Sequence, residues 1–188
     1  SSIRMRKKTK VSKRTNEQKQ CAKTKCGRLL RNYRNFQWII DDESYFTLSH
    51  SDINGNNLYY LSDVRTCPDY IKFKEKAKFE QKLLVWIAIS PKEMSKVFFR
   101  ESGNAINQYV YRDECLKKRL VPFIEEHHIN TDYVFWPDLS TSHYANPVQA
   151  FLNEKNVNFV PKLDNPANLP EDHSIEDFWS ILKENVYE

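Results

Sequence analysis

Glycine is almost absent from this sequence, with 3 residues in 188. Glycine-rich loops let a backbone approach phosphate closely in Walker-type and dinucleotide-binding sites, and neither fingerprint occurs in the chain. The sequence also lacks any uninterrupted apolar run near the roughly 18 residues that a membrane span needs. We therefore expect neither a glycine-cradled nucleotide site nor a membrane partner.

Cysteine is also scarce, and its spacing is irregular. Cys21, Cys26, Cys67 and Cys115 follow no disulfide-framework pattern, so we expect reduced thiols in a cell interior. Apolar and aromatic residues, in contrast, make up 40% and 13% of the composition. A chain of 188 residues with this composition is long enough for one folded domain with a substantial core.

The net charge of +4 conceals a basic arm followed by an acidic body. Residues 1–35 hold 13 Lys and Arg against one acid, Glu17, a balance of +12, whereas the rest holds 16 basic and 24 acidic residues, a balance of −8. A basic arm suits a polyanion such as DNA, because neutralised phosphates release counterions. A solvating tail or a localisation signal is the alternative. The candidate DNA-binding residues are Arg4, Arg6, Lys7, Lys8, Lys10, Lys13 and Arg14.

Apolar periodicity predicts an α/β domain after this arm. Thr15 and Gln18 form a capping-box pattern ahead of an amphipathic helix over 16–34. The predicted strands are 36–42, 45–48, 83–89, 97–99, 132–137 and 157–160, and further helices begin near 107, 146 and 174. We expect Pro122 to kink or end the second helix and Asn146 to cap the third. The order predicts a mixed five-stranded sheet, three antiparallel strands plus two parallel ones, flanked by helices.

The first predicted strand runs directly into three carboxylates, Asp41, Asp42 and Glu43. Buried unpaired charges cost several kcal/mol each, so these acids either lie past the strand end in solvent or are compensated. A later apolar stretch ends in the same way at Asp138, and Glu176 opens the last helix. Two carboxylates about 4 Å apart repel by roughly 4 kcal/mol at an effective dielectric near 20. A magnesium or manganese ion shared by two strand-end aspartates and the glutamate would remove that repulsion.

Three sequence blocks resemble the catalytic blocks of the Tc/mariner transposases. They are Asp41-Asp42-Glu43-Ser44-Tyr45-Phe46, Asp138 followed five positions on by His143, and Pro170 with Ile175-Glu176-x-x-Trp179-x-x-Leu182-Lys183. A slip of one residue in the strand register would exchange Asp42 with its neighbour Asp41. The resemblance favours Asp42. It implies an RNase H-like fold over residues 36–188, in which Asp42, Asp138 and Glu176 are catalytic and bind two Mg²⁺ or Mn²⁺ ions.

The same resemblance implies cut-and-paste transposition in the nucleus, in which double-stranded DNA is cleaved at transposon ends and joined to a TA target. A homodimer is implied for the full-length protein. The chain departs from the family at Leu139, at Ser174, and in a gap of 37 residues between Asp138 and Glu176, but no departure removes a metal ligand. We interpret the chain as a C-terminally truncated piece without the family's upstream DNA-binding region. Such a piece should not recognise transposon ends alone.

Several residues keep two interpretations. Asp41 and Glu43 are either exposed or support the metal ligands. His143 either supports the second acid or caps the loop before the helix near 146, and His173 either contacts substrate or covers its loop.

Two further sets of alternatives concern a histidine pair and the function. The pair His127 and His128 resembles part of a metal site, but no Cys or His partner lies at ligand spacing. We therefore predict that the pair lies at a surface helix end. The alternatives for the function are a non-catalytic DNA-binding remnant and a general RNase H-like nuclease.

Overall fold

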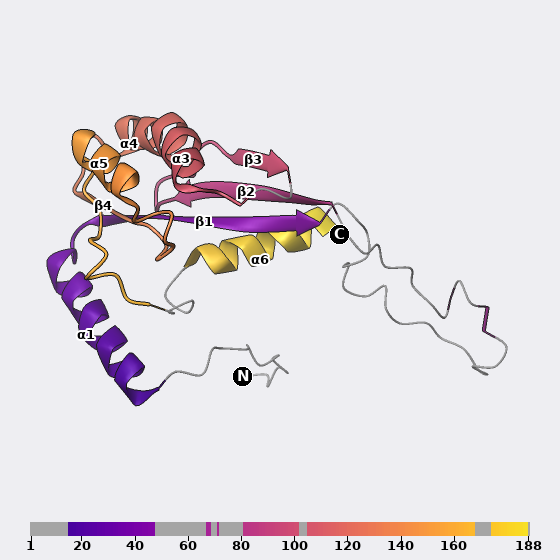
Figure 1. Cartoon of the computed structure of the whole chain (residues 1–188), viewed down its shortest axis with the longest axis horizontal. Coiled ribbons are helices and arrows are strands. Elements are labelled where there is room, and N and C mark those ends of the chain that lie inside the picture. Colours follow the sequence, from indigo (N-terminus) through magenta and orange to yellow (C-terminus); the bar gives the residue numbers. More distant parts are fainter. Residues whose placement is uncertain are drawn as a thin grey trace, which may run out of the picture.

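The longest strand, β1 (Gln37–Thr47), runs along the middle of the sheet (Figure 1). The computed structural model describes residues 15–47, 67–68, 71, 81–101, 105–167 and 174–187. The other strands in these ranges are β2 (Lys82–Ile89), β3 (Phe98–Glu101) and β4 (Tyr133–Trp136). Their order is β3-β2-β1-β4, with β3, β2 and β1 antiparallel and β4 parallel to β1. The predicted mixed sheet with three antiparallel strands is confirmed.

The sheet has four strands within the described residues, so the prediction of a fifth is wrong. At the expected position, Phe159 forms a single parallel bridge with Phe135. The backbone of Phe135 donates to Asn158 over 2.8 Å and accepts from Val160 over 2.9 Å. Pro161 follows at once, and because proline has no N–H to donate, the ladder does not continue.

Two predicted strands, 36–42 and 45–48, are one strand, because β1 is not interrupted at its acids. Its pairing with β2 runs without a break from Ile40 to Thr47, and Leu48 lies outside the described residues. The backbone of the acids therefore belongs to the ladder, and their side chains alternate between the two faces of the sheet.

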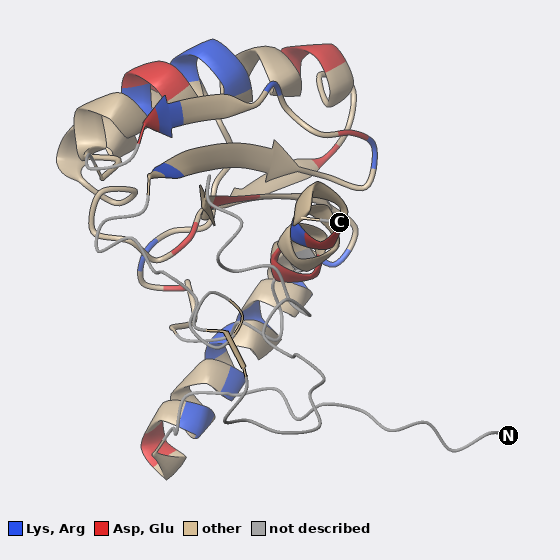
Figure 2. Cartoon of the chain, turned by 90° about the vertical axis from the view of Figure 1, so that its right-hand side faces the viewer, with Lys and Arg blue, Asp and Glu red and all other residues tan. Residues whose placement is uncertain are grey.

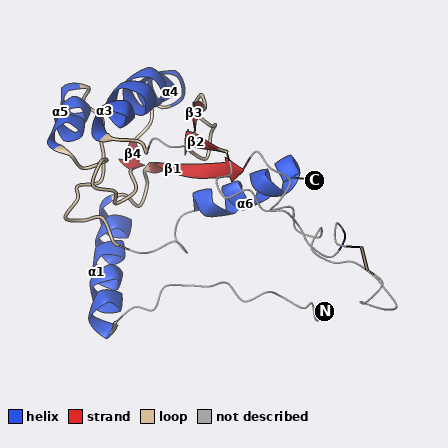
Figure 3. Cartoon of the chain, turned by 45° about the vertical axis from the view of Figure 1, so that its right-hand side comes forward, coloured by secondary structure: helices blue, strands red, loops and turns tan. Residues whose placement is uncertain are grey.

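Helices cover both faces of the sheet (Figure 3). They are α1 (Asn16–Asn32), α3 (Gln108–Val110), η3 (Tyr111–Leu120), α4 (Val121–His127), α5 (Asn146–Glu154) and α6 (Ser174–Tyr187). η3, α4 and α5 pack on one face around a core that includes Ile39 and Phe135. α1 and α6 pack on the other around a core that includes Ile40 and Trp136. None of the helices in the described ranges is long and apolar enough to cross a membrane.

α3, η3 and α4 are consecutive parts of one continuous helix. In η3 the hydrogen bonds span five residues, as where the N–H of Val121 donates to Leu116. Pro122 is the second residue of α4, directly after the five-residue hydrogen bonding ends, and it has no N–H to donate. The helix therefore changes geometry near this proline and continues to His127.

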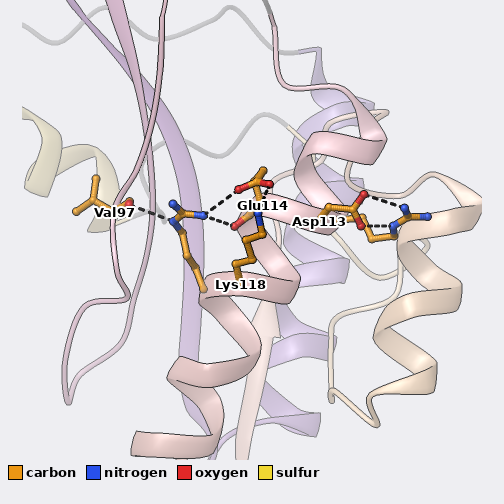
Figure 4. Close-up of polar contacts among 6 residues, drawn as sticks. Val97, Asp113, Glu114 and Lys118 are labelled. Carbon is orange, nitrogen blue, oxygen red and sulfur yellow. Dashed lines mark hydrogen bonds and ion pairs between the residues drawn. The ribbon is translucent and has the colours of Figure 1, made fainter.

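Arg119 ties this long helix to the chain just before the edge strand β3. Figure 4 shows the polar contacts around Val97, Glu114 and Lys118. The Nε of Arg119 donates to the carbonyl of Val97, just before β3, over 3.1 Å, and its guanidinium lies 4.8 Å from the centroid of the Phe98 ring. One turn of the same helix is bridged by Lys118 and Glu114 over 2.6 Å. These contacts fix η3 over the sheet.

α1 packs on the body through one apolar stripe. The capping box predicted from Thr15 and Gln18 is present, with both reciprocal hydrogen bonds. Leu29 is buried in the second core, and Lys25 donates to the carbonyl of Asn165 over 3.0 Å. Basic residues line much of the remaining surface of the helix (Figure 2). α1 therefore combines a contribution to the core with a basic outer surface.

Two local predictions are wrong. His128, expected at a surface helix end, is buried with its Nε2 3.0 Å from the hydroxyl of Ser90, because the chain turns back into the sheet just after α4. The N-cap of α5 is Ala145 rather than Asn146, since Pro147 already lies in the first turn. None of the four cysteines forms a disulfide, as expected.

Candidate active site

Three acids follow one another in the middle of β1 and point to alternate faces of the sheet. Asp41 and Glu43 face the side of η3, where Asp41 bonds to Tyr111. Asp42 faces α6, where it bonds to Trp179. This alternation is the direct consequence of strand geometry, so acids adjacent in sequence have different surroundings.

Asp42 is held by the last helix. Nε1 of Trp179 donates to Oδ2 of Asp42 over 3.0 Å. Burial raises the pKa of the Asp42 carboxyl to about 7; a hydrogen bond from the backbone of Glu43 opposes this rise, and the charges of Glu176, Glu43 and Asp41 add to it. The negative charge of ionised Asp42 therefore has too little positive charge around it, and a bound cation would stabilise it.

Glu176 comes near Asp42 because α6 is docked along β1. Trp179 is buried under the sheet, and at the far end of α6 the hydroxyl of Tyr187 donates to the carbonyl of Thr47 over 3.1 Å. Glu176 precedes Trp179 by one helical turn and is exposed. The spacing Glu-x-x-Trp therefore places an exposed carboxylate and a buried donor on neighbouring positions of one helix surface.

Asp138 follows β4 just beyond the end of its pairing with β1. The last parallel pair is Ile40 with Trp136, and Asp42 and Asp138 each come two residues later in the sequence. If the pairing continued, this register would set the two acids opposite each other on one face of the sheet. Asp138 is exposed, and its Oδ1 accepts from the backbone of Leu139 over 2.7 Å.

On the face of β1 that points away from α6, the other two acids enter a buried hydrogen-bonded network. Asp41 is 1% exposed, and its Oδ2 accepts from the indole of Trp86 over 2.9 Å and from the hydroxyl of Tyr111 over 2.6 Å. Burial raises the pKa of Asp41 to about 6, against the charge of His143 and these hydrogen bonds. Oε1 of Glu43 lies 3.1 Å from Nε2 of His143.

His143 joins this network to the second acid. Its ring is 1% exposed, stacks on Tyr111 with 3.8 Å between centroids, and has its Nδ1 3.3 Å from the carbonyl oxygen of Asp138. Both ring nitrogens face oxygen acceptors, so both donate. Burial lowers the pKa of His143, but the hydrogen bond to Glu43 and the charges of Asp41, Glu43 and Asp138 outweigh burial and raise it to about 9.

Comparison with known proteins identifies relatives of this chain. No protein-family model matches it. It is 28% identical over 149 residues to the transposable element Tc3 transposase of Caenorhabditis elegans. The aligned region covers 79% of this chain and 42% of that protein. The Mos1 transposase paired-end complex with left transposon end has the same fold, with a TM-score of 0.73 at 15% identity over 98% of this chain and 53% of that one. The resemblance to the Tc/mariner transposases is confirmed.

Other solved structures extend this comparison. The catalytic domain of Mos1 mariner transposase matches with a TM-score of 0.66 at 14% identity, over 96% of this chain and 76% of that chain. The Mos1 mariner paired-end complex with Mn matches with a TM-score of 0.72 at 16% identity, over 97% and 54%. The chain has the fold of a Tc/mariner transposase catalytic domain, and it spans less than half the length of the Tc3 transposase that it matches.

The Tc/mariner resemblance predicts three acids, and the structure brings two of them within electrostatic reach of each other. The charge of Glu176 acts on Asp42, whereas the charge of Asp138 acts on His143. Within the described ranges, no three His, Cys, Asp or Glu side chains form a group that could hold a metal ion. The remaining candidates lie outside the described residues; they are His173, Arg4, Arg6, Lys7, Lys8, Lys10, Lys13 and Arg14.

The sequence did not reveal the partners of the acids in β1. Trp86 and Trp179 are both buried, and each donates to one of these acids. Asp41 is buried, so the interpretation that it is exposed is wrong. Tyr111 has no sequence signal, since it follows Asp41 by 70 residues. The one-turn spacing of Glu176 and Trp179 is the signal that could have revealed the Trp179 contact.

Proposed function

We propose that this chain is the catalytic domain of a Tc/mariner-type DNA transposase, which cleaves DNA at transposon ends and joins the ends to target DNA. The observation that carries the proposal is the approach of Glu176 on α6 to Asp42 on the central strand, secured by Trp179. The sequence similarity to the Tc3 transposase and the fold shared with Mos1 support it.

Asp42, Asp138 and Glu176 are the residues that would hold two divalent ions. Carboxylates are the ligands that Mg²⁺ and Mn²⁺ prefer, and the raised pKa of Asp42 marks a carboxylate with too little positive charge around it. Among the similar Mos1 structures, one paired-end complex is with Mn and another is with Mg. Bound at such a site, two ions would activate the attacking oxygen and stabilise the leaving one.

The protein side chains would orient these ligands. Trp179 occupies Oδ2 of Asp42 and so favours one orientation of that carboxylate. Asp138 and Glu176 are exposed, so core packing does not fix their side-chain rotamers. Because the acids repel one another, we expect metal binding and assembly of the three to be coupled.

The proposed substrate is double-stranded DNA carrying transposon ends, with a TA dinucleotide as target. The 13 Lys and Arg of residues 1–35 support contact with phosphates, and α1 exposes part of this set, including Lys23 and Arg31. A nuclear location and a homodimer of the full-length protein are proposed with this substrate, on the resemblance to the family.

Calorimetric titration of Mn²⁺, with nicking of labelled duplex DNA in parallel, tests the proposal. The wild-type chain should bind Mn²⁺ and nick DNA. Asp42→Asn should abolish both, and Asp138→Ala should abolish nicking and weaken Mn²⁺ binding, while both variants retain a cooperative thermal transition. The control is Asp132→Asn, which changes an exposed acid before the other end of β4 and should behave as wild type. A folded wild type that binds no Mn²⁺ would contradict the proposal.

A second candidate is a DNA-binding remnant without catalysis. One observation favours it: within the described ranges the three acids are not assembled. DNA binding that persists in a chain unable to bind Mn²⁺ would support this candidate. A general RNase H-like nuclease shares the chemistry instead, and nicking that is never followed by joining of the cut 3′ end to a target duplex would identify it.

A further inference from the structure

The loop that carries Asp138 is fastened to β1 by a histidine bridge. Nδ1 of His143 lies 3.3 Å from the carbonyl oxygen of Asp138, and its Nε2 lies 3.1 Å from Oε1 of Glu43. Glu43 is the residue next to Asp42 on β1. His143 therefore joins the strand of the first acid to the main chain of the second.

The sheet itself stops short of this point. The last pair between β1 and β4 is Ile40 with Trp136, two residues before Asp138. The side-chain amide of Asn165 donates to the carbonyl of Pro137 over 2.8 Å. Its other partners are Trp136 and Tyr144, neither of which belongs to β1. The His143 bridge relates Asp138 to an acid-bearing segment of β1.

Ring stacking adds to the hydrogen bonds that hold His143. The His143 ring lies nearly parallel to that of Tyr111, at an interplanar angle of 14°, and Tyr111 is fully buried. The hydroxyl of Tyr111 donates to Asp41 over 2.6 Å, so the surface on which the imidazole lies is itself anchored to β1. The imidazole cannot tilt or turn without losing this stacking and one or both of its hydrogen bonds.

We propose that His143 is a positioning residue that holds Asp138 at the level of Asp42, so that both can serve one metal site. The proposal rests on the proposed function for the role of the two acids. It assigns no contact between His143 and substrate or metal. Outer partners that orient metal ligands are typically worth about 10- to 100-fold in metal affinity, and His143 should contribute in that range.

A double-mutant cycle on Mn²⁺ affinity tests the proposal, because it shows whether His143 acts through Asp138. His143→Ala should weaken Mn²⁺ binding by about 10-fold or more. Once Asp138 is replaced by Ala, adding His143→Ala should cost little further affinity. Independent, additive losses would overturn the proposal. His127→Ala, on a partly exposed histidine of α4, is the matched control and should leave Mn²⁺ affinity unchanged.

NMR of the metal-free chain provides a readout that does not depend on the proposed function. In wild type, both ring nitrogens of His143 should carry slowly exchanging protons, as two donors require. The amide of Leu139, which donates to Asp138, should shift in His143→Ala but not in His127→Ala.

The two readouts separate the possible failures. A singly protonated His143 ring in wild type would overturn the bridge even if His143→Ala does not fold. If wild type binds no Mn²⁺, the proposed function fails, and an unmoved Leu139 amide in folded His143→Ala would separately overturn the positioning role.

Discussion

The indole nitrogen of Trp179 lies 3.0 Å from Oδ2 of Asp42 and joins the last helix to the central strand at the first acid of the site. The two residues are 137 positions apart in the chain. This contact holds one oxygen of the Asp42 carboxylate and, through the helix, sets where Glu176 lies. Such a hydrogen bond fixes both the orientation of a ligand and its basicity.

Replacing Trp179 by Phe should weaken Mn²⁺ binding by about 10-fold. The substitution keeps an aromatic ring against Phe46 and removes the indole N–H that bonds to Asp42. Calorimetric titration measures the change. Tyr187→Phe is the control, because it removes a hydrogen bond between α6 and β1 at Thr47 instead. Equal losses in both variants would mean that helix docking, and not the bond to Asp42, is responsible.

The stability of the metal-free chain should fall as pH rises from about 4 to about 7, relative to Asp42→Asn. Burial and acidic neighbours raise the pKa of Asp42 from 3.8 to about 7 in the folded chain. The folded state therefore binds the proton more tightly than the unfolded state, and stability is lost where that proton is released. Urea unfolding of both proteins across this range measures the difference, and a constant difference would show that the folded pKa of Asp42 is not raised.

Tyr111→Phe should destabilise the fold by about 1–3 kcal/mol, since it leaves the buried Asp41 carboxylate with one donor fewer. The ring that stacks on His143 is retained. Chemical unfolding measures the loss of free energy. Tyr109→Phe, on a 53% exposed tyrosine of the same helix, is the control and should cost almost nothing; similar values for both would argue that the Tyr111 hydroxyl does not stabilise Asp41.

Leu29→Ala should destabilise the fold by about 2–5 kcal/mol, the usual range for a buried leucine. Leu29 is 2% exposed in the core beneath the sheet, whereas its neighbour Leu30 is 64% exposed. Leu30→Ala is therefore a control that conserves the chemistry of the change. Thermal or urea unfolding compares the two, and equal small effects would mean that α1 does not contribute to the core.

Much of the fold could be predicted from local patterns. The capping box of α1, the unbroken apolar run of β2 and the amphipathic α6 are encoded within single segments, where periodicity and capping chemistry act over a few residues. The predicted break in β1 and the predicted fifth strand were wrong for a shared reason. Whether a short extended segment is paired depends on its neighbour in the sheet, and Pro161 ends the pairing beside Phe159.

The sequence by itself predicted which acids stand at the candidate site, because Asp42, Asp138 and Glu176 fall in blocks that resemble those of the Tc/mariner transposases. It also determined that residues adjacent to Asp42 point the opposite way, since alternation is a property of any strand. The tertiary structure alone decided the partners. Trp179 meets Asp42 and His143 meets Glu43 across 137 and 100 residues. Such contacts depend on how helices and loops pack on the sheet, which local sequence does not encode.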